Sequence, residues 1–192
     1  MSAITLDPTT TALVLIDLQN GITQMETHPH SAASVIGNAA KLAQRFREVG
    51  APVVLVNVAF PLGPAALRPM ADAVMNLPPV MPDGWDEIVA DLDAKPDDIR
   101  ITKRQWGAFY GTALDLQLRR RGIKTIVLGG IATNIGVEST ARDAYELGYH
   151  QVIVEDLCGS TVSQEMHDFA FKFIFPRIAR VGKTEDVLQA LA

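Results

Sequence analysis

The sequence predicts a three-layer α/β/α domain with a parallel sheet as its middle layer. Short runs of Val, Ile and Leu alternate along the chain with longer segments of helical periodicity. Several of these runs are apolar at consecutive positions rather than at alternate ones, which is typical of parallel strands covered by helices on both faces. Strand–helix alternation implies right-handed crossovers, which place helices on both sides of one sheet. The length of 192 residues fits a single domain over 1–192.

The strand candidates are the short runs rich in Val, Ile and Leu. The first run, 12–16, ends abruptly at Asp17. The second, 53–58, follows Gly-Ala-Pro at 50–52, which is a helix-stop signal. The remaining runs are 99–102, 125–129, 152–155 and 178–181.

The helix candidates lie between these runs, at about 31–49, 111–121, 135–148, 163–175 and 184–191. Gly50, Gly122 and Gly148 each follow the last periodic residue of a candidate, where a left-handed C-terminal cap is expected. Ser163 and Thr184 are expected to cap the helices that follow them. Two acidic residues come directly after Thr184, where the helix dipole favours negative charge.

The segment 60–96 fits this alternation least well. It holds most of the prolines of the chain, and 85–92 is a candidate for a short helix. Long connections in compact domains are typically lids or binding loops. A packed surface insertion is an equally good interpretation of this segment.

Composition excludes several classes of protein. Apolar residues make up 48% and charged residues 20%, so the chain is not disordered. Its 17 basic and 22 acidic residues form no long run of either sign, which argues against binding to nucleic acid or an anionic membrane. No secretory signal is recognisable over 1–10, and no apolar stretch approaches the ~18 residues that span a bilayer. We therefore expect a cytoplasmic protein without membrane association.

Metal and disulfide chemistry are not predicted. Cys158 is the one cysteine, so it forms no internal disulfide and builds no thiolate zinc site. His28 and His30 flank Pro29, and no carboxylate or further histidine accompanies them at ligand spacing in the sequence. We therefore predict no metal ligands and no cofactor.

Candidate functional residues follow the ends of the predicted strands. In open parallel sheets the site lies beyond the carboxyl ends of the strands. Asp17 ends the first strand, Lys103 the third, and 130–136 follows the fourth. An Asp and a Lys at this edge form either an ordinary structural ion pair or an acid–base pair in which burial raises the pKa of the Asp. Neither the turn after the first strand nor the glycines after the fourth carry a nucleotide-binding fingerprint.

Three blocks of sequence are similar to the signature blocks of the isochorismatase-like hydrolases: 12–20, 101–109 and 130–140. The resemblance covers nearly the whole chain in the right order, and continues through Glu155 and Asp156. It implies a six-stranded parallel sheet of order 3-2-1-4-5-6, and a non-proline cis peptide at Ile131–Ala132. In that order the third strand is ~10 Å from the first, so Lys103 has to turn inward.

The resemblance also implies site residues. Most members of this family use an Asp–Lys–Cys triad, and Asp17 and Lys103 match its first two residues. At the cysteine position this sequence has Gly136, so the chain cannot form a thioester intermediate there. The isochorismatases proper also have a glycine here and hydrolyse a vinyl ether with the Asp as acid. The implied roles are Asp17 as general acid/base, Lys103 as its charge partner, and the Ala132 and Gly136 amides as oxyanion donors.

Two alternatives to this function remain open. One is a catalytically silent or regulatory member of the family that binds a small carboxylate. The other uses Cys158 as a displaced nucleophile, although a buried inert thiol is the better interpretation of that residue.

Further residues are candidates for substrate contact. Trp106 and Phe109 either line the pocket wall or are plain core aromatics. Gln19 either contacts substrate or caps the turn that follows the first strand. The helix around 169–175 is apolar nearly all round, which predicts a homo-oligomer.

Overall fold

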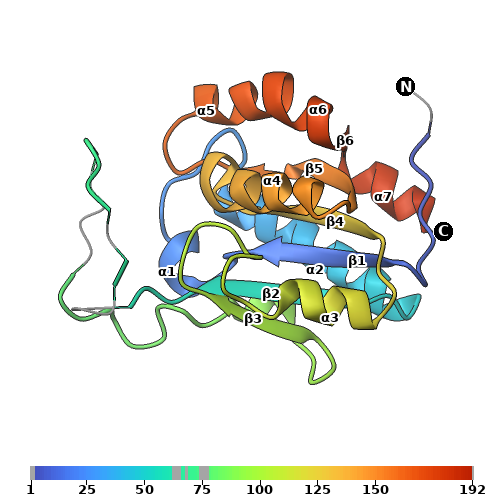
Figure 1. The fold of residues 1–192 in the computed structure, drawn as a ribbon, viewed down its shortest axis with the longest axis horizontal. Helices are drawn as coiled ribbons and strands as arrows, with labels where there is room; N and C mark the ends of the chain where they lie inside the picture. Colours follow the sequence, from blue (N-terminus) through green and yellow to red (C-terminus); the bar gives the residue numbers. More distant parts are fainter. Residues whose placement is uncertain (1–2, 62–65, 68, 74–77, 192) are drawn as a thin grey trace.

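The computed structural model describes residues 3–61, 66–67, 69–73 and 78–191. A six-stranded parallel sheet of order β3-β2-β1-β4-β5-β6 forms the middle of the fold (Figure 1). Its strands are β1 (Thr11–Ile16), β2 (Val53–Val58), β3 (Ile99–Lys103), β4 (Thr125–Ile131), β5 (His150–Gly159) and β6 (Arg180–Gly182). The predicted fold class and strand order are therefore confirmed.

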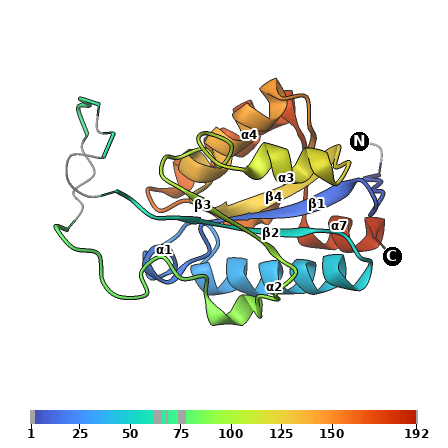
Figure 2. The same cartoon turned by 60° about the horizontal axis from the view of Figure 1, so that its bottom comes forward.

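Helices cover both faces of the sheet (Figure 2). On one face lie α2 (Ala32–Glu48) and α7 (Thr184–Ala190), and on the other α3 (Leu114–Arg120) and α4 (Glu138–Glu146). The remaining helical segments are α1 (Asn20–Thr23), η2 (Ala90–Leu92), η3 (Thr133–Val137), α5 (Gln164–Phe169), η4 (Ala170–Ile174) and α6 (Phe175–Ile178). Among the described residues, no helix combines the length and the apolar character needed to cross a membrane.

Alternate residues of the central strands supply two separate apolar cores. In β1, Leu13 and Leu15 pack with α2 and α7, whereas Val14 and Ile16 pack with α3 and α4. Successive side chains of a strand point to opposite faces, so a strand buried on both sides must be apolar at every position. This is why central strands such as β1 appear as unbroken apolar runs, whereas β3 at the edge of the sheet has every second residue exposed.

The helix ends mostly follow the predicted signals. The three capping glycines have positive φ angles of 73°, 69° and 79°. Ser163 Oγ accepts a hydrogen bond from the Met166 amide at 3.3 Å, so it caps α5 as predicted. Thr184 does not cap α7; it is the first residue of that helix, and its amide and hydroxyl donate to Asp156 Oδ1 at 2.8 and 2.9 Å.

Other boundaries differ from the prediction in detail. The predicted helix 163–175 consists of α5, η4 and α6 in succession, and extends to Ile178. Only η2 is helical within 85–92. β5 runs to Gly159, so Cys158 lies within this strand rather than beyond it.

The helical segment 169–175, from which the sequence predicts a homo-oligomer, has one buried side and one exposed side. Phe175 is fully buried in the core, whereas Phe169 and Phe173 are 53% and 44% exposed. The homo-oligomer itself stays a prediction.

Candidate active site

The structure brings Asp17 and Lys103 together at the carboxyl edge of the sheet. Lys103 Nζ lies 2.8 Å from Asp17 Oδ2, although β2 separates their two strands. The long lysine side chain spans this separation, so it turns inward as the strand order requires. Asp17 has a positive φ of 53°, and its amide donates to the Val56 carbonyl at 2.9 Å. The backbone thus turns immediately after β1 while it stays tied to β2.

Burial controls the protonation of this pair. The side chains of Lys103 and Asp17 are only 2% and 7% exposed. Asp17 Oδ1 is buried and has no hydrogen-bond partner among the described residues. Desolvation raises the pKa of Asp17 to about 6, against the charge of Lys103, which lowers it. A carboxyl group with this pKa can both give and take a proton near neutral pH.

Gly136 occupies the third corner of this arrangement. A Cβ built on Gly136 would lie 3.2 Å from Asp17 Oδ2 and 3.6 Å from Lys103 Nζ. It would also lie 2.9 Å from Cγ2 of the buried Ile16, which is closer than packed carbon atoms tolerate. A side chain at this position would therefore press on the ion pair, whereas glycine keeps the space beside Asp17 open.

The backbone next to Gly136 also has the predicted form. The Ile131–Ala132 peptide is cis. η3 follows it, and the Val137 amide donates to the Ala132 carbonyl at 3.2 Å. At the end of β4, Gly130 lies so close to β1 that a Cβ there would be 2.1 Å from the Ile16 carbonyl oxygen. Glycine at this position lets the two strand ends approach each other, which places η3 next to Asp17.

A cavity of about 370 Å³ opens onto these residues. Its charged side chains are those of the ion pair, and most of the other lining side chains are apolar. The lining residues are Asp17, Gly21, Ile22, Met25, Val58, Phe60, Pro78, Met81, Pro82, Trp85, Lys103, Trp106, Ile131, Ala132, Ile135, Gly136 and Thr161. Its volume and apolar walls are typical of a small-molecule site.

Trp85 also lines the cavity, although the sequence analysis did not identify it as a site residue. A Cβ on Gly21 would lie 1.9 Å from Trp85 Nε1, so the indole fits only because Gly21 has no side chain. The Gly21 amide donates to the Trp85 carbonyl at 2.8 Å, and the Trp85 ring lies 5.9 Å from that of Phe60. The described end of the proline-rich segment is thus packed against α1 and supplies Pro78, Met81 and Pro82 to the cavity. Residues 62–65, 68 and 74–77 of that segment lie outside the described residues.

Two predicted substrate contacts do not line this cavity. The side chain of Gln19 is fully buried and holds the backbone of Val58 from both sides, at 2.7 Å to its amide and 3.0 Å to its carbonyl. The ring of Phe109 packs against that of Tyr149, with 5.7 Å between the centroids. Both therefore support the fold, whereas Trp106 and Ala132 do line the cavity.

Cys158 cannot replace the missing nucleophile. It is fully buried among the apolar residues of the α3–α4 core and pairs with Gly130 in the sheet register. Burial also raises the pKa of its thiol far above the ordinary value. The thiolate that such chemistry needs is therefore strongly disfavoured.

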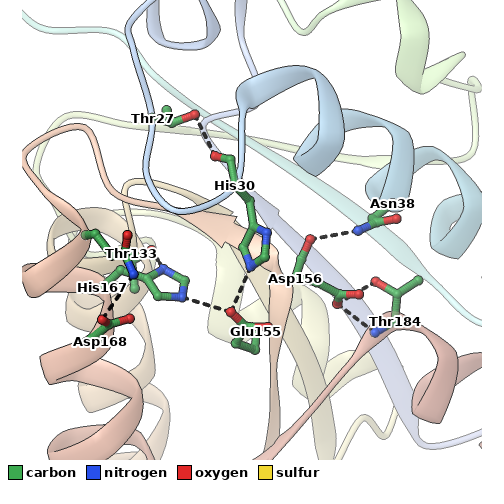
Figure 3. Close-up of polar contacts among 10 residues, drawn as sticks. Thr27, His30, Asn38, Thr133, Glu155, Asp156, His167, Asp168 and Thr184 are labelled. Carbon is green, nitrogen blue, oxygen red and sulfur yellow. Dashed lines mark hydrogen bonds and ion pairs between the residues drawn. The ribbon is translucent and has the colours of Figure 1, made fainter.

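A second polar cluster lies beside this site, contrary to the expectation that the histidines lack partners (Figure 3). His30, Glu155 and His167 come together at the side of β5 that faces α5. That expectation rested on spacing along the chain, whereas the fold brings Glu155 Oε1 to 2.7 Å from His30 Nε2 and 3.2 Å from His167 Nε2. The absence of metal ligands itself stays a prediction. Burial lowers the pKa of His167. Desolvation acts to raise the pKa of Glu155, but the hydrogen bonds and charges of the two histidines hold it below its ordinary value.

Comparison with known proteins identifies relatives along nearly the whole chain. Residues 11–186 match the family model described as isochorismatase domain. The uncharacterized isochorismatase family protein YecD of Escherichia coli O157:H7 is 54% identical over 187 residues, which cover 97% of this chain and 98% of that protein. The ureidoacrylate amidohydrolase RutB of Acinetobacter baylyi is 33% identical, over 86% of this chain and 77% of its own.

Solved structures show the same similarity. An isochorismatase family protein from Burkholderia thailandensis superposes with a TM-score of 0.93 at 47% identity, and the match covers 99% of each chain. The chain therefore has a fold that is already known from solved structures of relatives.

Proposed function

The chain belongs to the isochorismatase family and is a hydrolase of that family, and we propose that it hydrolyses a small molecule by acid–base chemistry of Asp17 and Lys103, without a cysteine nucleophile. One observation carries this proposal. The two side chains lie 2.8 Å apart, nearly buried, on the wall of a cavity into which Gly136 offers no thiol.

The reaction begins with a proton. Protonated Asp17 gives it to an electron-rich atom of the substrate, such as the enol carbon of a vinyl ether. The adjacent carbon then becomes an oxocarbenium ion, to which a water molecule adds. The proton that this water loses returns to the Asp17 carboxylate, and the adduct breaks its C–O bond to give a carbonyl compound and an alcohol. No covalent bond to the enzyme forms at any step.

Lys103 and the backbone support this sequence. The ammonium group stabilises Asp17 when it is ionised, and so lowers the cost of giving up the proton. We assign the Ala132 and Gly136 amides to the substrate oxygen as hydrogen-bond donors. The space beside Gly136 holds the attacking water or a group of the substrate.

The cavity indicates the class of substrate. Its walls carry Phe60, Trp85 and Trp106, which favour a molecule with a flat apolar body. Lys103 is the one cation among the described lining residues, and Asp17 balances its charge only while the carboxyl group is ionised. In the protonated form that starts the reaction, the charge of Lys103 is unbalanced, which favours a substrate with an acidic group beside its apolar body.

A screen of vinyl ethers, ureides and amides tests the proposal. Wild type and Asp17→Asn are assayed in parallel, with Asp97→Asn, an exposed aspartate outside the cavity, as the matched control. We expect turnover in wild type and Asp97→Asn and its loss in Asp17→Asn. A substrate hydrolysed equally well by Asp17→Asn would contradict the mechanism. Binding without turnover in wild type would support the silent alternative instead.

A further inference from the structure

We infer that His30, Glu155 and His167 form a binding site for one divalent transition-metal ion of the zinc class. The ion would lie outside the catalytic cavity, where it fastens three distant segments of the chain together. The inference does not depend on the proposed catalytic function.

The geometry of the three side chains carries this inference (Figure 3). Nε2 of His30 lies 2.7 Å from Glu155 Oε1, and Nε2 of His167 lies 3.2 Å from the same oxygen. All three potential ligand atoms lie within 4.8 Å of one another. With zinc–ligand bonds of about 2.0–2.2 Å, the ligand atoms of a tetrahedral site are about 3.3 Å apart. Side-chain shifts of about 1 Å would therefore bring the three atoms around one ion.

The donor set selects the kind of ion. Two imidazole nitrogens and one carboxylate oxygen suit zinc and its neighbours among the divalent transition metals. Calcium and magnesium prefer sites made of oxygen ligands. Three protein ligands and one water molecule give the four-coordinate arrangement that zinc favours.

The cluster has the outer support that metal-binding histidines need. His167 Nδ1 lies 2.9 Å from Thr133 Oγ1, which orients the ring so that Nε2 faces Glu155. When Nε2 binds a metal, its proton moves to Nδ1, and the Thr133 hydroxyl accepts the resulting N–H instead of donating. The Thr27 hydroxyl donates to the His30 carbonyl at 2.8 Å and so holds the loop that carries this ligand.

An ion can reach this position from solvent. The side chains of His30 and Glu155 are 27% and 26% exposed, whereas His167 is only 1% exposed. One ligand, His167, is therefore fixed in the interior, and the other two are partly exposed. The three ligands lie close together before any metal binds.

The position of the cluster indicates a structural role for the ion. None of its three residues is among the described residues that line the catalytic cavity. However, Thr133 directly follows Ala132, and the cluster joins the loop before α2 to β5 and α5. An ion bound here would therefore stabilise the segment that carries Ala132 and Gly136 without touching the substrate.

Titration of chelator-treated protein with Zn²⁺ and Co²⁺ tests this inference. Calorimetry gives the affinity and the number of ions per chain, and the visible spectrum of Co²⁺ reports nitrogen and oxygen ligation. His30→Gln and Glu155→Gln remove the two exposed ligands, and Thr133→Val removes the outer hydrogen bond. His150→Gln is the matched control, because His150 is exposed and outside the cluster.

We expect one ion per chain in wild type and in His150→Gln, together with a higher melting temperature when Zn²⁺ is present. Each ligand variant should weaken binding by at least about 10-fold, and Thr133→Val by about 10–100-fold. Wild-type protein that binds neither ion at one per chain would overturn the inference. So would binding that His30→Gln and Glu155→Gln leave as tight as His150→Gln does.

Discussion

Two clusters of charged side chains lie at the same edge of the sheet, and they differ in how far water reaches them. Asp17 and Lys103 are nearly sealed in the wall of an apolar cavity, whereas His30 and Glu155 are each about a quarter exposed. The pKa of Asp17 is raised, mainly by desolvation, and that of Glu155 is lowered by its histidine partners. Burial thus makes one carboxyl group able to donate a proton, whereas the two histidines keep the other ionised.

The comparison predicts the largest effect for the loss of the buried carboxyl group. Asp17→Asn should lower kcat/KM by about 10²–10⁴-fold, because the amide cannot transfer the proton. Glu155→Gln should retain most of the activity, since Glu155 lies outside the cavity wall. Steady-state kinetics on any substrate from the screen measures both. Equal losses in the two variants would remove the distinction between the clusters.

Stability should show which charge state of Asp17 the fold prefers. Asp17→Asn has the charge of protonated Asp17, which the native state favours, so its free energy of unfolding at pH ~7 should not fall although Lys103 loses its counter-charge. The double variant Asp17→Asn/Lys103→Met removes both charges and should be at least as stable. Urea unfolding of the single and double variants checks this, with Glu155→Gln expected to cost about 1 kcal/mol. A loss of about 3–5 kcal/mol in Asp17→Asn that the double variant recovers would show that the fold needs Asp17 ionised.

The pH dependence of stability should show the raised pKa of Asp17. Native Asp17 binds its proton more tightly than the unfolded chain, whose value is 3.8, so the native state is favoured by protonation. This contribution is fully present below 3.8 and is lost as the pH rises through about 6. Its full size is up to about 3 kcal/mol. Unfolding of wild type against the double variant between pH 3.5 and about 7 measures it, and a difference that grows with pH would contradict it.

A side chain at Gly136 should have a smaller effect. Gly136→Ala puts a methyl group against Ile16 and Asp17, and should cost about 1–3 kcal/mol of stability as well as activity. Gly136→Cys places a thiol near Lys103, where iodoacetamide should alkylate it much faster than the buried Cys158 of wild type. Mass spectrometry of the alkylated protein gives both rates, and equal rates would mean that Gly136 does not face the cavity.

The parts of the fold that local chemistry specifies could be predicted from the sequence. The unbroken apolar strands required a sheet covered on both faces, and Asp17 and Lys103 were identified because each ends a strand at the same edge. Gly136 was identified by its place in the family pattern. The contact of Gly136 with the ion pair could not be predicted, because the side-chain conformation of Lys103 decides whether it extends across β2 to Asp17.

Other residues could not be placed from the sequence. His30 is 125 positions from Glu155, and His167 is 12, so no local spacing signals the cluster. Gln19 and Phe109 lie within the signature blocks, yet their side chains hold the fold rather than line the cavity. Trp85 lies in the proline-rich segment, where only the missing side chain of Gly21 makes room for it.

Carbon-13 NMR of aspartate-labelled protein tests the central claim most directly, because it needs no substrate. The account predicts one carboxyl resonance that titrates with a midpoint near 6 and is missing from Asp17→Asn. In Lys103→Met this midpoint should move higher, since the ammonium group that lowers it is gone. An Asp17 resonance that titrates at or below 3.8 would contradict the account, because the group would then hold no proton to transfer.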